Sequence, residues 1–164
     1  MKDSILESSK VKQTITRLAY QIYEESYKET ELHLIGINSA GMQLGEKLKS
    51  NLKEISPLDI HIHQLTINPK RPLDETNLSV SSELLKGKQV IIVDDVANTG
   101  RTLFYGCRPI MDVLPKKIEF AVLVDRKHKH FPVKVDYVGL SLATTLKEHI
   151  IVEFNGDDTE VYFA

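Results

Sequence analysis

The chain has 164 residues, a formal net charge of -2 and a single cysteine, Cys107. This length predicts one domain, residues 1–164, with a core of its own. The near-neutral charge gives no overall attraction for nucleic acid, and one cysteine excludes both an intrachain disulfide and a thiolate-rich metal site. Apolar runs fall short of the ~20 residues of a membrane span and no signal-peptide block is evident, so we expect a cytoplasmic protein without a membrane partner.

Residue spacing in the first half of the chain alternates between helical and extended patterns. Apolar residues at helical spacing predict an amphipathic helix over about 11–30. Residues 32–38 are typical of a strand, and 40–55 return to helical periodicity. The alternating segment 58–67 predicts another strand, and 68–77, with two prolines, predicts a long loop. Loops of that length are commonly functional or disordered.

The second half continues this alternation. Residues 89–96 form a nearly all-apolar β-branched run, which is typical of a central parallel strand. A helix should follow from about Thr102, and Pro109 should bend it or end it early. Two further strands and a terminal hairpin are predicted at 118–125, 135–142 and around Asn155-Gly156. We therefore predict an α/β fold, a doubly wound, mostly parallel sheet flanked by helices, with a small accessory hood.

The stretch VIIVDDVANTGRT, residues 90–102, carries the strongest functional signal. Ligands of open parallel sheets bind beyond the carboxyl ends of strands, where Asp94 and Asp95 should lie. The following loop can present backbone N–H groups and the hydroxyls of Thr99 and Thr102 to a phosphate at a helix N-terminus. The two acids would repel that phosphate, so they are better suited to ribose hydroxyls or a hydrated magnesium ion. The plainer alternative is that they only end a strand and cap the next helix.

This stretch resembles the phosphoribosyl pyrophosphate (PRPP) motif of type I phosphoribosyltransferases. TRLAYQI (16–22), GINSAG (36–41) and AVLVDRKHKHFPVKVDYVG (121–139) are similar, in the same order, to the family of bifunctional pyrimidine operon attenuators and uracil phosphoribosyltransferases. The likeness covers most of the chain and is weakest over 68–88. It implies the type I phosphoribosyltransferase fold, transfer of phosphoribose from PRPP to a base, Mg²⁺ bound mainly through PRPP, and a homo-oligomer, a dimer or larger.

The resemblance also assigns the PRPP residues. Asp94 and Asp95 bind the ribose diol and are the catalytic candidates, and no side chain is expected to bind the metal directly. The loop that takes the 5'-phosphate comprises Ala97, Asn98, Thr99, Gly100, Arg101 and Thr102.

Two further loops stand where the family binds pyrophosphate and closes its site. The pyrophosphate loop corresponds to Ile37, Asn38, Ser39, Ala40 and Gly41, although these residues could also form a simple tight turn. The family usually has Lys or Arg in this loop, and the charged side chain hydrogen-bonds the departing pyrophosphate. The absence of such a side chain here predicts slow turnover. In the flexible loop 68–77, Lys70 and Arg71 are the cations near the tip. A merely solvated loop is the alternative, and the family's catalytic residues of this loop cannot be carried over.

The base pocket is expected at Val124, Asp125 and Arg126, which end a strand beside the ribose site. Purine-salvage relatives tend to have lysine where Asp125 stands and aspartate where Asn98 stands. Their absence favours a pyrimidine, uracil above all, or some other nitrogenous base. Asp125 could instead form a salt bridge in the strand-end turn.

The histidine pairs His61/His63 and His128/His130 raise a metal hypothesis, which we reject at this level because no third ligand at suitable spacing is evident. His61 and His63 instead alternate with apolar residues as solvent-facing strand residues would. The basic turn 126–130 is either a solvated loop or an anion-binding, RNA-facing surface.

Three functions therefore remain: a phosphoribosyltransferase, an RNA-binding attenuation regulator with a nucleotide effector, and a PRPP- or nucleotide-binding protein with little turnover.

Cys107 is expected to be a small buried residue rather than a reactive thiol.

Overall fold

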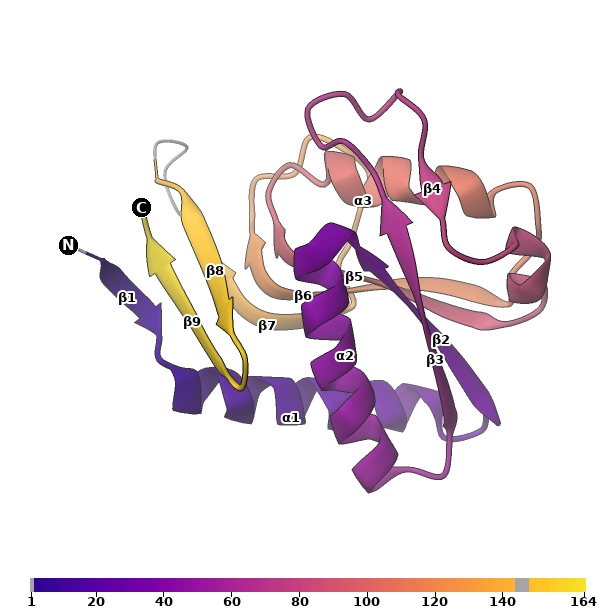
Figure 1. The fold of residues 1–164 in the computed structure, drawn as a ribbon, viewed down its shortest axis with the longest axis horizontal. Coiled ribbons are helices and arrows are strands. Elements are labelled where there is room, and N and C mark those ends of the chain that lie inside the picture. The colour runs from indigo at the N-terminus through magenta and orange to yellow at the C-terminus, as the bar shows by residue number, and fades with distance from the viewer. Residues whose placement is uncertain (1, 144–147) are drawn as a thin grey trace.

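A six-stranded sheet forms the centre of the molecule in a computed structural model that describes residues 2–143 and 148–164. Its strand order is β4-β3-β2-β5-β6-β7 (Figure 1). All neighbours pair in parallel except β4, which is antiparallel to β3. The strands are β2 (Glu31–Ile37), β3 (Asp59–Thr66), β4 (Asn77–Leu78), β5 (Gln89–Ala97), β6 (Lys117–Arg126) and β7 (Tyr137–Leu142).

Helices cover both faces of this sheet. The long helices α1 (Ser8–Ser26) and α2 (Asn38–Ile55) pack on one face, and their apolar stripes meet a core that includes Leu34, Ile91 and Val93. The short helix α3 (Arg101–Gly106) and the 3₁₀ turns η1 (Ser82–Leu85) and η2 (Arg108–Ile110) cover the other face. The central strands β2, β5 and β6 are therefore buried on both sides, as parallel strands require.

A separate antiparallel sheet of three strands forms the hood, in the order β1-β9-β8 (Figure 1). Its strands are β1 (Asp3–Leu6), β8 (Ile150–Asn155) and β9 (Asp158–Phe163). The hairpin between β8 and β9 turns at Gly156, whose φ of 63° is the left-handed conformation that glycine tolerates. Pairing of β1 with β9 brings the two ends of the chain together.

Most predicted elements are present, with shifted ends. Pro109 has the expected effect, because α3 ends at Gly106 and residues 108–110 form a 3₁₀ turn. The sequence did not indicate β1, β4 or η1, which are short and only partly buried. Cys107 is half-buried, and burial raises the pKa of its thiol to about 11, so it is a poor nucleophile.

Within the described residues, no helix has the length and apolar character needed to cross a membrane.

Candidate functional site

A cavity of about 550 Å³ opens at the carboxyl edge of the central sheet, where β5 ends and α3 begins. Parallel sheets place their ligand sites at this edge. The lining comes from the end of β5, the following loop, the loop after β3 and one residue before β8. Its members are Pro69, Lys70, Asp94, Val96, Ala97, Asn98, Thr99, Gly100, Arg101, Thr102, Leu103 and His149.

The two adjacent acids occupy different positions relative to this cavity. Asp94 is part of the lining, and its Oδ1 accepts the N–H of Asp95 at 2.9 Å. Burial raises the pKa of Asp94 well above its usual range, and the neighbouring Asp95 charge raises it further. Asp95 does not line the cavity, and its Oδ1 accepts the N–H of Val96 at 2.8 Å. The structure therefore brings Asp94, but not Asp95, onto the cavity surface.

All six predicted phosphate-loop residues, 97–102, lie in the cavity lining. Gly100 makes the turn into α3 with a φ of 86°, which a residue with a side chain would adopt only under strain. Its carbonyl accepts the N–H of Phe104 at 2.9 Å and so starts the helix. The first amides of a helix have no partner within the helix, so this turn offers donors to an anion.

The loop 68–77 lies against α3 and contributes to the same cavity. Arg101 donates a hydrogen bond to the carbonyl of Pro69 at 2.5 Å, and Arg108 donates one to the carbonyl of Pro72 at 3.3 Å. Lys70 lines the cavity, whereas Arg71 pairs with Asp74 at 3.1 Å and its side chain is 74% exposed. Lys70 and Arg71 are thus not equivalent, and Lys70 is the one next to the phosphate loop.

The predicted pyrophosphate loop, residues 37–41, joins β2 directly to α2 and does not line the cavity. Asn38 has a φ of 52°, and its side-chain amide makes two hydrogen bonds, 2.9 and 3.0 Å, with the backbone of Ile67. Its side chain therefore holds the chain after β3 in place. A Cβ on Gly41 would lie 2.4 Å from the carbonyl oxygen of Val93. Only glycine lets the first turn of α2 pack this closely against β5, one residue before Asp94.

The predicted base-pocket residues at the end of β6 also lie outside the cavity lining. Asp125 pairs with Lys129 at 2.5 Å, which is the salt bridge considered as the alternative for this residue. Lys129 also donates to the carbonyl of Arg126. Arg126 in turn donates to the side-chain oxygen of Asn98 at 3.4 Å, so the end of β6 contacts the phosphate loop.

Sequence reasoning missed four of the lining residues. Pro69 and Val96 lie within the loop 68–77 and the motif 90–102, where no role was assigned to them, and Leu103 directly follows that motif. His149 comes from the tail just before β8, and no motif there marked it. The tertiary packing of the hood beside the central sheet brings this residue to the cavity.

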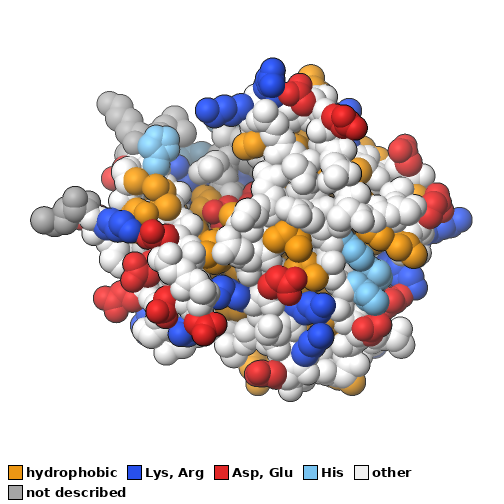
Figure 2. Space-filling model, viewed as in Figure 1, with side chains coloured by type: hydrophobic (Ala, Val, Ile, Leu, Met, Phe, Trp, Pro, Cys, Tyr) orange, Lys and Arg blue, Asp and Glu red, His pale blue; other side chains and the backbone are white. Residues whose placement is uncertain are grey.

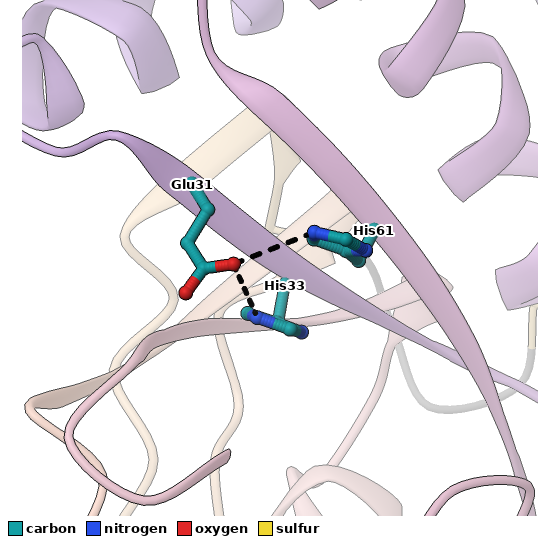
Figure 3. A group of neighbouring side chains, drawn as sticks. All are labelled: Glu31, His33 and His61. Carbon is teal, nitrogen blue, oxygen red and sulfur yellow. Dashed lines mark ion pairs between the residues drawn. The ribbon is translucent and has the colours of Figure 1, made fainter. Parts of the chain in front are cut away.

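The opposite, amino edge of the sheet contradicts one conclusion drawn from the sequence. His61 of the pair His61/His63 does have two further candidate ligands beside it. His33 on β2 lies next to His61 on β3, and Glu31 lies next to both (Figure 3). His61 and His63 are also partly buried rather than fully solvent-facing. Sequence spacing along one strand could not reveal a partner that the parallel register supplies.

Comparison with known proteins agrees with this architecture. A family model described as a phosphoribosyl transferase domain matches residues 1–158. The crystal structure of the hypoxanthine phosphoribosyltransferase of Trypanosoma cruzi superposes with a TM-score of 0.79 at 16% identity, covering 98% of this chain and 96% of that one. At this identity the likeness concerns the fold, which is that of type I phosphoribosyltransferases.

The chain belongs to the phosphoribosyltransferase family. Among curated relatives, the "Bifunctional protein pyrR" of Enterococcus faecalis is 35% identical over 96% of this chain and 92% of its own length. The protein of the same name from Geobacter sp. is 36% identical over 96% of this chain and 94% of its own. The resemblance to the bifunctional attenuator group therefore extends over nearly the whole chain.

Proposed function

We propose that the chain transfers phosphoribose from PRPP to a pyrimidine, uracil, and releases pyrophosphate. One observation carries the proposal: the cavity at the carboxyl edge unites a partly buried carboxylate, Asp94, with the whole loop 97–102. A carboxylate accepts hydrogen bonds from ribose hydroxyls, and the N–H groups of the loop donate hydrogen bonds to a 5'-phosphate. A relative from Lactococcus lactis, 34% identical and named "Pyrimidine operon regulatory protein", supports a pyrimidine as the base.

In this proposal the 5'-phosphate lies on the amides of 98–102, with hydroxyl donors from Thr99 and Thr102. The ribose diol donates to Asp94. Because Asp94 is desolvated, hydrogen bonds from the diol stabilise its charged form more than they would in water. Asp95 acts through its nearby charge, which favours the oxocarbenium-like transition state as positive charge builds on the ribose.

The departing pyrophosphate needs positive charge that residues 38–40 lack. The start of α2 lies outside the cavity lining but packs against β5 at Val93, one residue before Asp94, and we assign its backbone amides part of the stabilisation. Lys70 lines the cavity and is placed to supply the rest. We therefore assign to Lys70 the charge that the family's pyrophosphate loop usually carries, and to residues 68–77 the role of excluding water.

Magnesium fits the donors of this site. Mg²⁺ is usually bound by one or two carboxylates together with substrate phosphates, and Asp94 is a carboxylate on the cavity surface. The ion would be bound mainly through PRPP, where it would neutralise charge on the leaving group, and the negative charge of Asp94 would favour it without a direct bond. The resemblance further supports a cytoplasmic enzyme that works as a homo-oligomer.

The base is placed toward the end of β6. Val124 pairs with Val96, a cavity residue, across the parallel strands. Arg126 reaches the phosphate loop through Asn98, and the Asp125–Lys129 ion pair fixes the turn that follows. In this arrangement Asp125 positions the base pocket instead of contacting the base.

Pyrophosphate release, measured with PRPP, Mg²⁺ and a panel of uracil, cytosine, hypoxanthine and guanine, tests the proposal. We expect release with uracil and at least tenfold less with either purine. Faster release with hypoxanthine than with uracil would contradict the proposed base. PRPP binding without release for any base would instead favour a nucleotide-binding protein with little turnover.

RNA binding is a second proposed function, which the name "Pyrimidine operon regulatory protein" of the Lactococcus lactis relatives favours. Lys127 and Lys134 are exposed, whereas Lys129 is engaged by Asp125. Binding should weaken steeply with salt, because phosphate contacts release counterions. Filter binding that shows no preference for a pyrimidine-leader RNA over a random one would contradict this function.

A further inference from the structure

The amino edge of the sheet holds a group of polar side chains that the proposed reaction does not use. We call Glu31, His33 and His61 the histidine cluster (Figure 3). Glu31 and His33 lie two residues apart on β2 and therefore on one face. The parallel register pairs His33 with His61 and Glu31 with Asp59. Histidine side chains also gather at the molecular surface toward the β2 and β3 side of the sheet (Figure 2).

The ligand atoms lie close together. Oε2 of Glu31 lies 3.6 Å from Nε2 of His33 and 3.4 Å from Nε2 of His61. The three ligand atoms are within 4.8 Å of one another. Tetrahedral zinc with bonds of about 2.0–2.1 Å puts neighbouring ligand atoms roughly 3.3 Å apart, close to both carboxylate-to-nitrogen distances. The rings of His33 and His61 stack, with centroids 4.7 Å apart and planes at 13°, so at least one ring must turn before both nitrogens face one ion.

Two of these atoms are buried without a hydrogen bond. Within the described residues, Nε2 of His33 and Nε2 of His61 have no hydrogen-bond partner, although carboxylate oxygens lie near both. His33 is only 5% exposed, so solvent does not satisfy its ring. Buried polar atoms left in this way are costly, and a shared cation would satisfy both nitrogens and the Glu31 oxygen together.

Neighbouring groups hold the ligands in the state that a metal ion requires. Nδ1 of His33 lies 3.0 Å from Nε2 of His63, so His33 can donate its Nδ1 proton and leave Nε2 free for the ion. Lys88 pairs with the other carboxylate oxygen of Glu31, Oε1, so Oε2 is the oxygen that lies beside the two rings.

We propose that the histidine cluster binds a divalent transition-metal ion of the zinc class through Glu31 Oε2, His33 Nε2 and His61 Nε2. Two imidazoles favour such an ion over Mg²⁺ or Ca²⁺, which prefer oxygen ligands. Asp59, whose Oδ2 lies 2.9 Å from Nε2 of His61, adds negative charge on the solvent side, and Lys88 opposes it. The ion ties β2 to β3 and stabilises the folded chain, because the unfolded chain lacks the assembled site.

Zinc titration of the full-length protein tests this site. The chelator-stripped protein is titrated with Zn²⁺ at neutral pH in competition with a chromophoric chelator, and thermal unfolding is followed with and without the ion. We expect one Zn²⁺ per chain and a higher Tm with zinc. His61→Gln should weaken binding at least tenfold and remove the Tm increase. His128→Gln, which removes an exposed histidine elsewhere, is the matched control and should bind like the parent chain.

Other outcomes overturn the proposal. Glu31→Gln provides a second variant in case His61→Gln does not fold, and it should also weaken binding at least tenfold. Stoichiometric binding that persists in both variants, or no binding by the parent chain at micromolar zinc, would show that the cluster is not a metal site. Binding that is lost in Asp94→Asn instead would place the ion at the carboxyl edge.

Discussion

The two edges of the central sheet carry polar groups that are assembled in different ways. At the carboxyl edge, one continuous segment from Asp94 to Thr102 supplies most of the cavity. At the amino edge, Glu31, His33 and His61 come from two strands and meet only through the parallel register. A contiguous motif is visible in the sequence, whereas a cross-strand cluster becomes visible only when the strand pairing is known.

Burial also acts on the two edges in opposite directions. It raises the pKa of Asp94, so the ionised form of this carboxylate is disfavoured until a ligand donates hydrogen bonds to it. It lowers the pKa of His33 and of His63, so these rings stay neutral. The carboxyl edge is therefore suited to a ligand whose hydroxyl groups donate hydrogen bonds. The amino edge is suited to a metal ion, which accepts electron pairs from neutral histidine rings.

The largest expected effect is on PRPP affinity at the carboxyl edge. Asp94→Asn should weaken PRPP binding at least tenfold, about 1.4 kcal/mol or more, because a charged acceptor is lost from a desolvated site. Asp95→Asn should weaken it less, since Asp95 does not line the cavity. Calorimetry with PRPP and Mg²⁺ measures both. Equal losses in the two variants would show that both acids contact the ribose.

A second expected effect separates the two cations of the loop 68–77. Lys70→Ala should slow single-turnover transfer about tenfold, roughly 1.4 kcal/mol of barrier, because Lys70 lines the cavity. Arg71→Ala should change the rate less than threefold, since Arg71 pairs with Asp74 at the surface. Rapid-quench kinetics with uracil and PRPP measures the difference. Two equal effects would mean that the loop repositions Arg71 when PRPP is bound.

Stability should depend on pH through the amino edge. The pKa values of His33 and His63 are lower in the folded chain than the ordinary value of 6.5, so the unfolded chain binds more protons just below that pH. The free energy of unfolding of the metal-free protein should therefore fall by about 1 kcal/mol as the pH drops from about 7 to 5. Urea unfolding at several pH values measures this, and a smaller slope is expected in His33→Gln. A flat profile in the parent chain would contradict the buried neutral rings.

The smallest effect concerns Asp94 without ligand. Because its folded pKa is raised above the ordinary 3.8, the ionised residue destabilises the empty protein at neutral pH. Asp94→Asn should raise Tm by about 2–4 °C, which corresponds to about 1 kcal/mol in a chain of this size. Differential scanning calorimetry would measure the shift. A lower Tm would show that the Asp94 carboxylate stabilises the fold.

The sequence predicted the α/β sheet, the hood hairpin and the early end of α3, and it pointed to the segment 97–102 that lines the cavity, because each depends on local periodicity or on a contiguous motif. It did not predict β1, whose partner β9 lies at the other end of the chain. It also missed His149, which reaches the cavity through the packing of the hood. The pairs Glu31/His33 and Asp59/His61 stand at or next to the starts of two predicted strands. Connecting the two pairs would have required the knowledge that these strands are neighbours in the sheet.

The two edges of the sheet are expected to bind their ligands independently of each other. Calorimetric titration of Asp94→Asn and His61→Gln, each with PRPP–Mg²⁺ and, separately, with Zn²⁺, tests this most directly. Asp94→Asn is expected to lose at least tenfold in PRPP affinity and to keep its zinc affinity, whereas His61→Gln should keep its PRPP affinity and lose at least tenfold in zinc affinity. Loss of both ligands in either variant, with the fold intact by circular dichroism, would contradict two separate sites.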